Sequence, residues 1–337
     1  MRLQELSELS PALGRTVVIN VHTELVTTLA VASANRHGAG MPVLVVDCDA
    51  TPASDAYFDR LMERIPFDVV SSPLRPHGAT LDAIFPLLNA PIVLLLDSDA
   101  EIRDSHIVER LLSYFEVKWV FGAGYINNHP QWLGDGQGGN LRTGLLEERP
   151  WMPFVLFRST DVCDALEAGV SFRDRVICND FAASERLSAF LAKRLQHYSL
   201  PQSRVIRHLP GPVRERMRNA HLPWLAWARR DFGGLRPNFV SCDTGAEIYQ
   251  WLRRRGRVFA GLHSYLLRSE VVHYEGITRF RILNNQTRRR AAFPASAIEA
   301  EVIGRLTNEY GFRRDDLLDV PDCEFYPTLR GQTPFSV

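Results

Sequence analysis

The chain has 337 residues, of which 45% are hydrophobic, and its 39 basic and 39 acidic residues give a formal net charge of zero. This composition excludes a low-complexity chain and indicates one large globular domain or two closely packed ones. The five cysteines lie far apart and form no C-x-x-C pair, which indicates reduced thiols. The first ten residues are not continuously apolar, and no apolar run reaches the length of a membrane span. We therefore expect a cytoplasmic protein.

The first 100 residues alternate between expected strands and expected helices. Short runs of branched apolar side chains predict strands at 16–21, 42–47, 67–71 and 91–96. Apolar residues at helical spacing predict helices between them, at 25–36, 52–65 and 81–88. This order predicts an α/β fold with a doubly wound, mainly parallel sheet. Ligands of such sheets bind at the carboxyl ends of the strands.

The fourth of these strands leads directly into acidic residues. PIVLLL at 91–96 is followed by Asp97-Ser98-Asp99, and Glu101 comes two positions later. Carboxylates this close repel one another, and a divalent cation is the usual reason to tolerate them at the mouth of a sheet. Because Mg²⁺ and Mn²⁺ bind few carboxylates and complete their shells with water and phosphate oxygens, the motif predicts a metal-bound nucleotide diphosphate. The alternative is a solvated turn after a core strand.

The pattern changes after a further expected helix and strand, at 107–115 and 119–125. A glycine-rich loop at 134–140 follows, and we place a domain boundary near it. The expected parts are a nucleotide-sugar-binding half at 1–125, an acceptor-binding and catalytic half at 126–294, and a C-terminal helix and tail at 295–337.

The middle part is basic, since Lys and Arg outnumber Asp and Glu by 24 to 12 over residues 151–294. The excess favours an anionic ligand or peripheral contact with the inner face of the membrane, and the alternative is a set of solvated arginine-rich helix faces. No nucleic-acid recognition module is present. Further strands are expected at 151–157, 239–242, 258–262 and 270–274, with helices at 246–255 and 297–310. Asp243 or Thr244 is expected to cap the helix at 246–255.

Together these features resemble the GT-A glycosyltransferases, and most closely the inverting family 2. The resemblance covers residues 15–285 and is strongest over 15–125. It is carried by Asp47, RPHGATLD at 75–82, Asp97-Ser98-Asp99, Asp243-Thr244-Gly245 and VHYEG at 272–276. It implies a metal-dependent transfer of a sugar from a nucleotide-diphosphate donor, with UDP the commonest, to a carbohydrate, lipid-linked or small-molecule acceptor.

The resemblance also implies roles for single residues on the donor side. Thr23 and Glu24 would border the nucleotide, and Asp47 would contact the base or ribose. Arg75 and Asp82 would lie near the base and diphosphate. Structural roles remain open as alternatives. Glu24 and Asp82 would also suit the first turns of helices, Asp47 could be a turn residue, and Arg75 could be an exposed surface arginine.

The same resemblance implies the metal site. Asp99 would ligate Mn²⁺ or Mg²⁺, Asp97 would hold ribose or a metal-bound water, and Ser98 would lie between them in the donor site. His273 would be the third ligand or a diphosphate contact, unless it is a hydrogen-bonded strand histidine. His263 is the fallback ligand, and Arg279 or Arg281 would add positive charge beside the diphosphate.

The acceptor side departs from the family. Family 2 commonly has a Glu-Asp pair where this chain has Cys242-Asp243, so Asp243 is the candidate base and inversion the expected outcome. Trp132 and Trp151 are expected either to stack on a sugar or to pack in the core. The alternatives are a retaining GT-A transferase, a nucleotidyltransferase, which would need a glycine-rich triphosphate loop, and a non-catalytic sugar-nucleotide-binding subunit.

Overall fold

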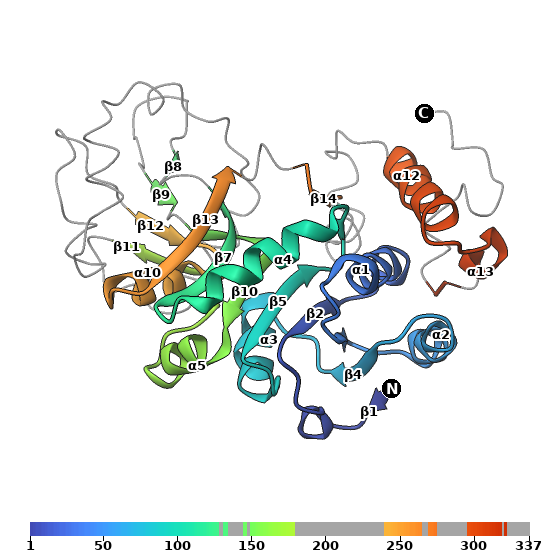
Figure 1. The fold of residues 1–337 in the computed structure, drawn as a ribbon, viewed down its shortest axis with the longest axis horizontal. Coiled ribbons are helices and arrows are strands. Elements are labelled where there is room, and N and C mark those ends of the chain that lie inside the picture. The colour runs from blue at the N-terminus through green and yellow to red at the C-terminus, as the bar shows by residue number, and fades with distance from the viewer. Residues whose placement is uncertain are drawn as a thin grey trace.

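An eight-stranded, mainly parallel sheet forms the centre of the protein (Figure 1). The computed structural model describes residues 1–127, 131–133, 144–146, 149–178, 239–264, 269–274, 295–318 and 320–321. Within them β10 runs antiparallel to both β5 and β7, whereas the other pairs of the sheet are parallel. In spatial order the strands are Arg2–Leu3 (β1), Asp68–Ser72 (β4), Val43–Cys48 (β3), Arg15–Asn20 (β2), Ile92–Asp97 (β5), Arg149–Arg158 (β10), Val120–Asn127 (β7) and Val258–Ser264 (β13). This order confirms the predicted α/β class with a doubly wound, mainly parallel sheet.

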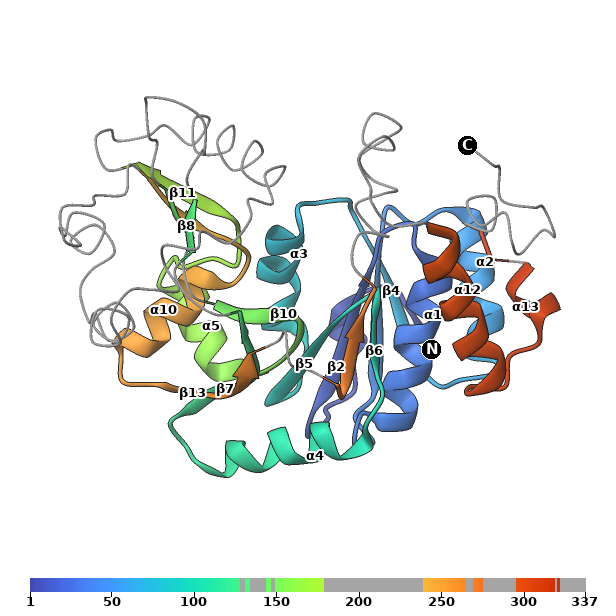
Figure 2. The same ribbon diagram turned by 90° about the horizontal axis from the view of Figure 1, so that it is seen from above.

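Helices cover both faces of the sheet (Figure 2). Successive residues of a strand point to opposite faces, and β5 shows the result. Its Leu94 and Leu96 join the core under α1, α2, α4 and α12, whereas Val93 and Leu95 join the core under α3, α5 and α10. The helices are Glu24–His37 (α1), Pro52–Met62 (α2), His77–Ile84 (α3), Ser105–Ser113 (α4), Ser159–Glu167 (α5), Ala246–Arg254 (α10), Ala295–Asn308 (α12) and Arg314–Leu318 (α13).

Two smaller sheets lie outside the main one. Ala100–Ile102 (β6) pairs antiparallel with Val271–His273 (β14), so the strand directly after the Asp-x-Asp motif meets a strand from the second half of the chain. The other sheet contains Arg175–Cys178 (β11), Phe239–Cys242 (β12), Gly144–Leu146 (β9) and Gln131–Leu133 (β8). Since β10 and β13 complete the main sheet, the two expected halves share that sheet, and the domain division stays a prediction.

The expected helix at 81–88 is wrong at both ends. Helix α3 begins at His77 and ends at Ile84, and the chain continues as the 3-10 turn Phe85–Leu87 (η2). Pro86 explains the early end, because proline has no backbone N–H and clashes with the preceding helical turn. Because α3 begins at His77, the loop between β4 and α3 is only four residues long, at 73–76. Two further 3-10 turns are Leu6–Glu8 (η1) and Tyr114–Glu116 (η3).

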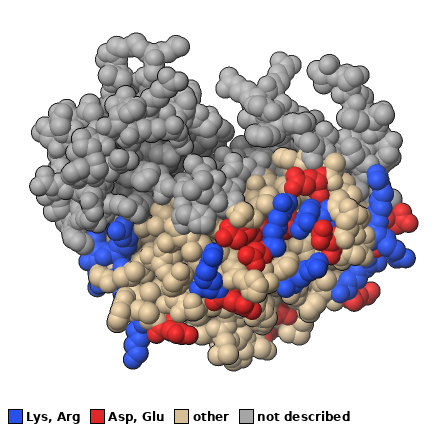
Figure 3. All heavy atoms as spheres, turned by 45° about the horizontal axis from the view of Figure 1, so that its top comes forward, with Lys and Arg blue, Asp and Glu red and all other residues tan. Residues whose placement is uncertain are grey.

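Among the described helices, none is both long and apolar enough to cross a membrane. Basic and acidic side chains are intermixed on the described part of the face in Figure 3, which therefore carries no large field of one sign. Most of the arginines that make 151–294 basic lie outside the described residues.

Candidate active site

The Asp-x-Asp motif lies where β5 ends. Asp97 is the last residue of β5, and Ser98 and Asp99 are each 5% exposed. The hydroxyl of Thr23, at the start of α1, donates to Ser98 Oγ at 3.3 Å. The motif is therefore attached to the amino end of α1, at the carboxyl edge of the sheet where the sequence predicted a ligand site.

His273 reaches this motif through the pairing of β6 with β14. His273 lies opposite Ala100 in the register, and the backbone N–H of Tyr274 donates to the Asp99 carbonyl at 2.8 Å. His273 Nε2 then lies 2.9 Å from Asp99 Oδ1 and 3.8 Å from Asp97 Oδ2. One ligand atom from each of these three residues lies within 4.8 Å of the other two. The structure thus brings together the three residues that were expected to bind a metal.

The chemistry of these donors fits a divalent cation. Burial raises the pKa of Asp97, the Asp99 charge raises it further, and His77, His273 and Arg149 only partly oppose these effects. A cation would relieve the crowding of the two carboxylates, and oxygen donors with one imidazole are acceptable to Mn²⁺. His263 lies in β13, but its side chain is outside the described part of the chain.

Trp151 packs against the His273 imidazole. Its ring is 4% exposed and meets the His273 imidazole edge-on, with centroids 5.6 Å apart and an interplanar angle of 83°. A second edge-on contact joins Trp151 to Tyr125 at 5.8 Å. Stacking of Trp151 on an acceptor stays a prediction, which its burial does not favour. Trp132 lies in β8, and its side chain is outside the described residues.

Asn20, which the sequence analysis missed, organises the ends of β2 and β3. Its amide nitrogen donates to Asp47 Oδ1 at 2.7 Å and to Glu24 Oε1 at 3.3 Å. Its carbonyl oxygen accepts from the hydroxyls of Thr23 at 3.1 Å and Thr27 at 2.7 Å. All five residues are buried, so the cluster stabilises the start of α1 against the strands. An asparagine at a strand end, followed by threonines three and seven positions later, was the available signal.

Asp47, which was expected to contact the base or ribose, is buried, at 1% exposure. Besides the Asn20 amide it accepts a hydrogen bond from the Ser54 hydroxyl at 2.9 Å, and burial raises the pKa of this carboxyl group. Its described contacts are therefore structural, and its contact with a base or ribose stays a prediction. The same holds for Glu24, which is 2% exposed.

Asp82 attaches the segment after α5 to α3. Its carboxylate accepts from the Ser171 hydroxyl at 2.6 Å and from the Phe172 backbone N–H at 2.8 Å, and it pairs with Arg173 at 3.3 Å. These contacts differ from the expected role near the diphosphate, which stays a prediction. Arg75 is exposed in the loop before α3.

Asp243 does not cap α10, so that expectation is wrong. Gly245 occupies the cap position with φ of +80°, a left-handed conformation that glycine adopts without strain, and no side chain caps the helix there. The Asp243 carboxylate instead accepts from the Thr244 backbone N–H at 2.9 Å and pairs closely with Arg149. The Asp243 side chain is 36% exposed.

A second carboxylate, Asp174, lies beside Asp243 and was not expected. The Thr244 hydroxyl donates to Asp174 Oδ1 at 2.7 Å. Burial and the charge of Asp243 raise the pKa of Asp174, whereas Arg149 and His77 lower it. Arg149 and His77 oppose the raised pKa of Asp97 as well as that of Asp174. Arg279 and Arg281, expected near the diphosphate, lie outside the described residues.

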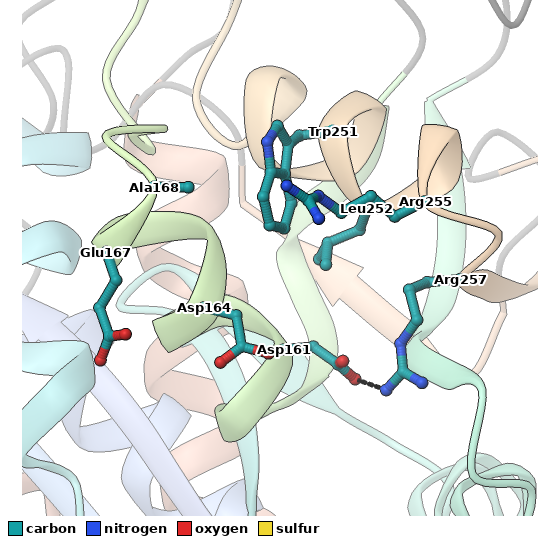
Figure 4. A pocket seen from close by; sticks show the side chains of 8 residues that line it. All are labelled: Asp161, Asp164, Glu167, Ala168, Trp251, Leu252, Arg255 and Arg257. Atoms are coloured by element: carbon teal, nitrogen blue, oxygen red, sulfur yellow. Dashed lines mark hydrogen bonds and ion pairs between the residues drawn. The ribbon is translucent and has the colours of Figure 1, made fainter.

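A separate pocket of about 280 Å³ opens between α5 and α10 (Figure 4). Trp251 and Leu252 from α10 face the acidic side of α5, and Arg257 pairs with Asp161 across the gap. Arg255 stacks on the Trp251 ring, with its guanidinium carbon 4.0 Å from the centroid. The pocket shares no lining residue with the candidate active site.

No protein-family model and no curated protein matches the chain. Solved structures that match include mannosyltransferase PcManGT from Pyrobaculum calidifontis in complex with GDP-Man and Mn²⁺, at 12% identity and a TM-score of 0.36, over 48% of each chain. A 4-diphosphocytidyl-2C-methyl-D-erythritol synthase from Anaerococcus prevotii matches at 6% identity and a TM-score of 0.35, over 46% of this chain and 74% of that one. TarS of S. aureus, residues 1–349, matches at 13% identity and a TM-score of 0.32, over 45% of this chain and 49% of that one.

The chain thus spans about half the length of PcManGT and of the TarS fragment.

Proposed function

We propose that this chain is a metal-dependent glycosyltransferase of the GT-A type, which transfers a sugar from a nucleotide-diphosphate donor to an acceptor hydroxyl. The observation that supports this most is the convergence of Asp97, Asp99 and His273 at the carboxyl end of β5. Open α/β sheets bind ligands at that edge. Mn²⁺ is the first expectation because of the imidazole, and Mg²⁺ is the second.

The bond from the anomeric carbon to the diphosphate breaks while a bond to the acceptor oxygen forms. A bound cation supplies Lewis-acid stabilisation of the leaving diphosphate. Asp243 accepts the proton of the acceptor hydroxyl, which attacks from the opposite face and inverts the anomeric carbon. Arg149 pairs with Asp243 and its charge also acts on Asp97, so it is placed to hold the base and to stabilise the diphosphate.

The substrates follow from the family resemblance rather than from the described contacts. A UDP-sugar is the expected donor, with Thr23 and Ser98 at its edge of the site. The acceptor is expected to be a carbohydrate, a lipid-linked sugar or a small molecule. Peripheral contact with a membrane would serve a lipid-linked acceptor, and the arginines of the middle segment are the candidates for it.

One observation favours retention as the second candidate. The Asp243 carboxylate is already engaged by Arg149, and a transfer that retains the anomeric configuration needs no base on the opposite face. NMR of the first-formed product separates the two outcomes, because the coupling constant of the anomeric proton reports its configuration.

The experiment that tests the proposal is calorimetric titration with a panel of nucleoside diphosphates, with and without Mn²⁺. Asp99→Asn is the test variant, and Glu109→Gln on the exposed side of α4 is the matched control. We expect one nucleotide to bind only with Mn²⁺, and this binding to be lost in the test variant alone. If no nucleotide binds the wild-type protein at millimolar concentration, the proposal is wrong, and a non-catalytic, metal-free reading of the three residues replaces it.

A further inference from the structure

Glu101 is fully buried and bound by four side chains. Arg103 Nε and the Tyr274 hydroxyl each donate to Oε2 at 2.9 Å. Arg305 Nε donates to Oε1 at 2.8 Å, and the Tyr310 hydroxyl donates to the same oxygen at 3.0 Å. The carboxylate itself is 0% exposed, so its charge is compensated by two guanidinium groups and two hydroxyls rather than by water.

These contacts join three parts of the chain that are distant in sequence. Glu101 lies in β6, two residues after Asp99, and Tyr274 directly follows His273. Arg305 belongs to α12, and Tyr310 comes two residues after its end. Helix α12 packs on α1, on the same face of the sheet as β6 (Figures 1 and 2).

We propose that Glu101 is a positioning residue for the metal site, which it controls by fixing His273 through Tyr274 and by coupling both to helix α12. The inference rests on the metal-dependent function proposed above. Glu101 touches no ligand or reacting atom, and it acts only through the placement of the strand that carries the histidine.

Glu101 is needed to position His273 because the pairing of β6 with β14 is short. Strands β6 and β14 are three residues each, and within the described residues they pair only with one another. An isolated two-stranded ribbon is at best marginally stable, so side-chain contacts must hold its register. At the carboxyl end of β14, immediately beside His273, the Tyr274 hydroxyl donates to Glu101 and accepts from Arg103 Nη2 at 2.9 Å, which adds to the backbone bond from the Tyr274 N–H to the Asp99 carbonyl. Because metal affinity depends on the placement of each ligand, loosening these contacts should weaken the site.

The test measures Mn²⁺ affinity in Tyr310→Phe and Glu101→Gln. Tyr310→Phe keeps the ring and removes one donor to Glu101, whereas Glu101→Gln disturbs all four contacts. We expect the Mn²⁺ dissociation constant from electron paramagnetic resonance to rise severalfold in the first and about tenfold or more in the second, as for other residues that orient metal ligands. Tyr57→Phe is the matched control, because it also removes one buried tyrosine hydroxyl, hydrogen-bonded to Thr28 at 2.6 Å, away from the metal ligands.

Hydrogen exchange gives a readout that does not depend on metal. The Tyr274 amide, which bonds to the Asp99 carbonyl, should lose protection in both test variants, while amides in β2 and β3 keep it. If both variants retain wild-type Mn²⁺ affinity and Tyr274 protection, the inference is overturned, even where the wild-type protein binds metal and nucleotide as proposed. If the wild-type protein binds no Mn²⁺, both the proposed metal-dependent function and the inference about Glu101 are wrong. If the Tyr57→Phe control weakens Mn²⁺ binding equally, the effect is general loosening and the inference is likewise overturned.

Discussion

Asp47→Ala separates a structural role from a nucleotide contact at the end of β3. The variant removes both acceptor oxygens, leaving the Asn20 amide and the Ser54 hydroxyl without this partner in a buried cluster. Hydrogen bonds to a charged group contribute roughly 1.5–3 kcal/mol each. Because burial raises the pKa of Asp47 and so opposes its charged form, we take the lower figure for both bonds, which gives a loss of about 3 kcal/mol.

That loss can be read from a melting curve. With an unfolding entropy of roughly 2.1 cal/mol/K per residue, a chain of this length should lose about 4 °C in Tm. Calorimetric nucleotide binding well below the melting temperature should stay within twofold of wild type, because the 1% exposed carboxylate makes its described contacts within the protein. An unchanged Tm together with a tenfold weaker nucleotide affinity would refute this reasoning and support the contact with base or ribose.

Trp151→Phe should weaken Mn²⁺ binding severalfold, measured by electron paramagnetic resonance, because the smaller phenyl ring reduces the edge-on contact with the His273 imidazole. An unchanged Mn²⁺ affinity would contradict this supporting role of Trp151. Asp174→Asn should raise Tm at pH 8, and the gain should shrink as the pH falls, since a carboxyl group with a raised pKa destabilises the fold only when ionised; a gain independent of pH would be inconsistent with its repulsion by Asp243. Burial opposes the charge of Glu270, but hydrogen bonds led by the Tyr125 hydroxyl lower its pKa from 4.5 to about 2. The ionised carboxylate therefore stabilises the fold fully at pH values above 4.5, and this stabilisation is lost as the pH falls from 4.5 towards 2. The stability difference between wild type and Glu270→Gln, measured by urea unfolding, should therefore narrow over that interval, and a constant difference would contradict it.

The fold could be predicted wherever the signal is local. The strand at 91–96 is an uninterrupted apolar run that ends in acids, and the structure has β5 at Ile92–Asp97. Helix α10 likewise follows from its apolar spacing and begins at Ala246 as predicted, but its cap differs from the expected one. Gly245 takes a left-handed conformation because its turn packs against Phe172 and Met152, and the sequence around Asp243 carries no sign of that contact.

The site was predictable only in part, for a related reason. The Asp-x-Asp spacing of Asp97 and Asp99 after an apolar strand was enough to predict them as candidate metal ligands. His273 was expected only through the family resemblance, because strands as short as β6 and β14 carry no pattern that pairs them across the chain. Asp174 was missed because its position beside Asp243 depends on a close approach that no motif records. The antiparallel pairing of β11 with β12 produces this approach, since Arg175 lies opposite Cys242 in the register.

The pairing of β6 with β14 also orders events during synthesis of the protein. Residue 273 follows residue 99 by 174 positions, and the Glu101 partners in and after α12 come later still. Segments near the amino terminus emerge first from the ribosome and can fold before the rest of the chain is made. The strands around Asp97 and Asp99 can thus form while the histidine is still untranslated, and a nascent chain would bind a cation poorly until α12 has been made. Full metal affinity would then report that helix α12 has been synthesised and has packed on α1.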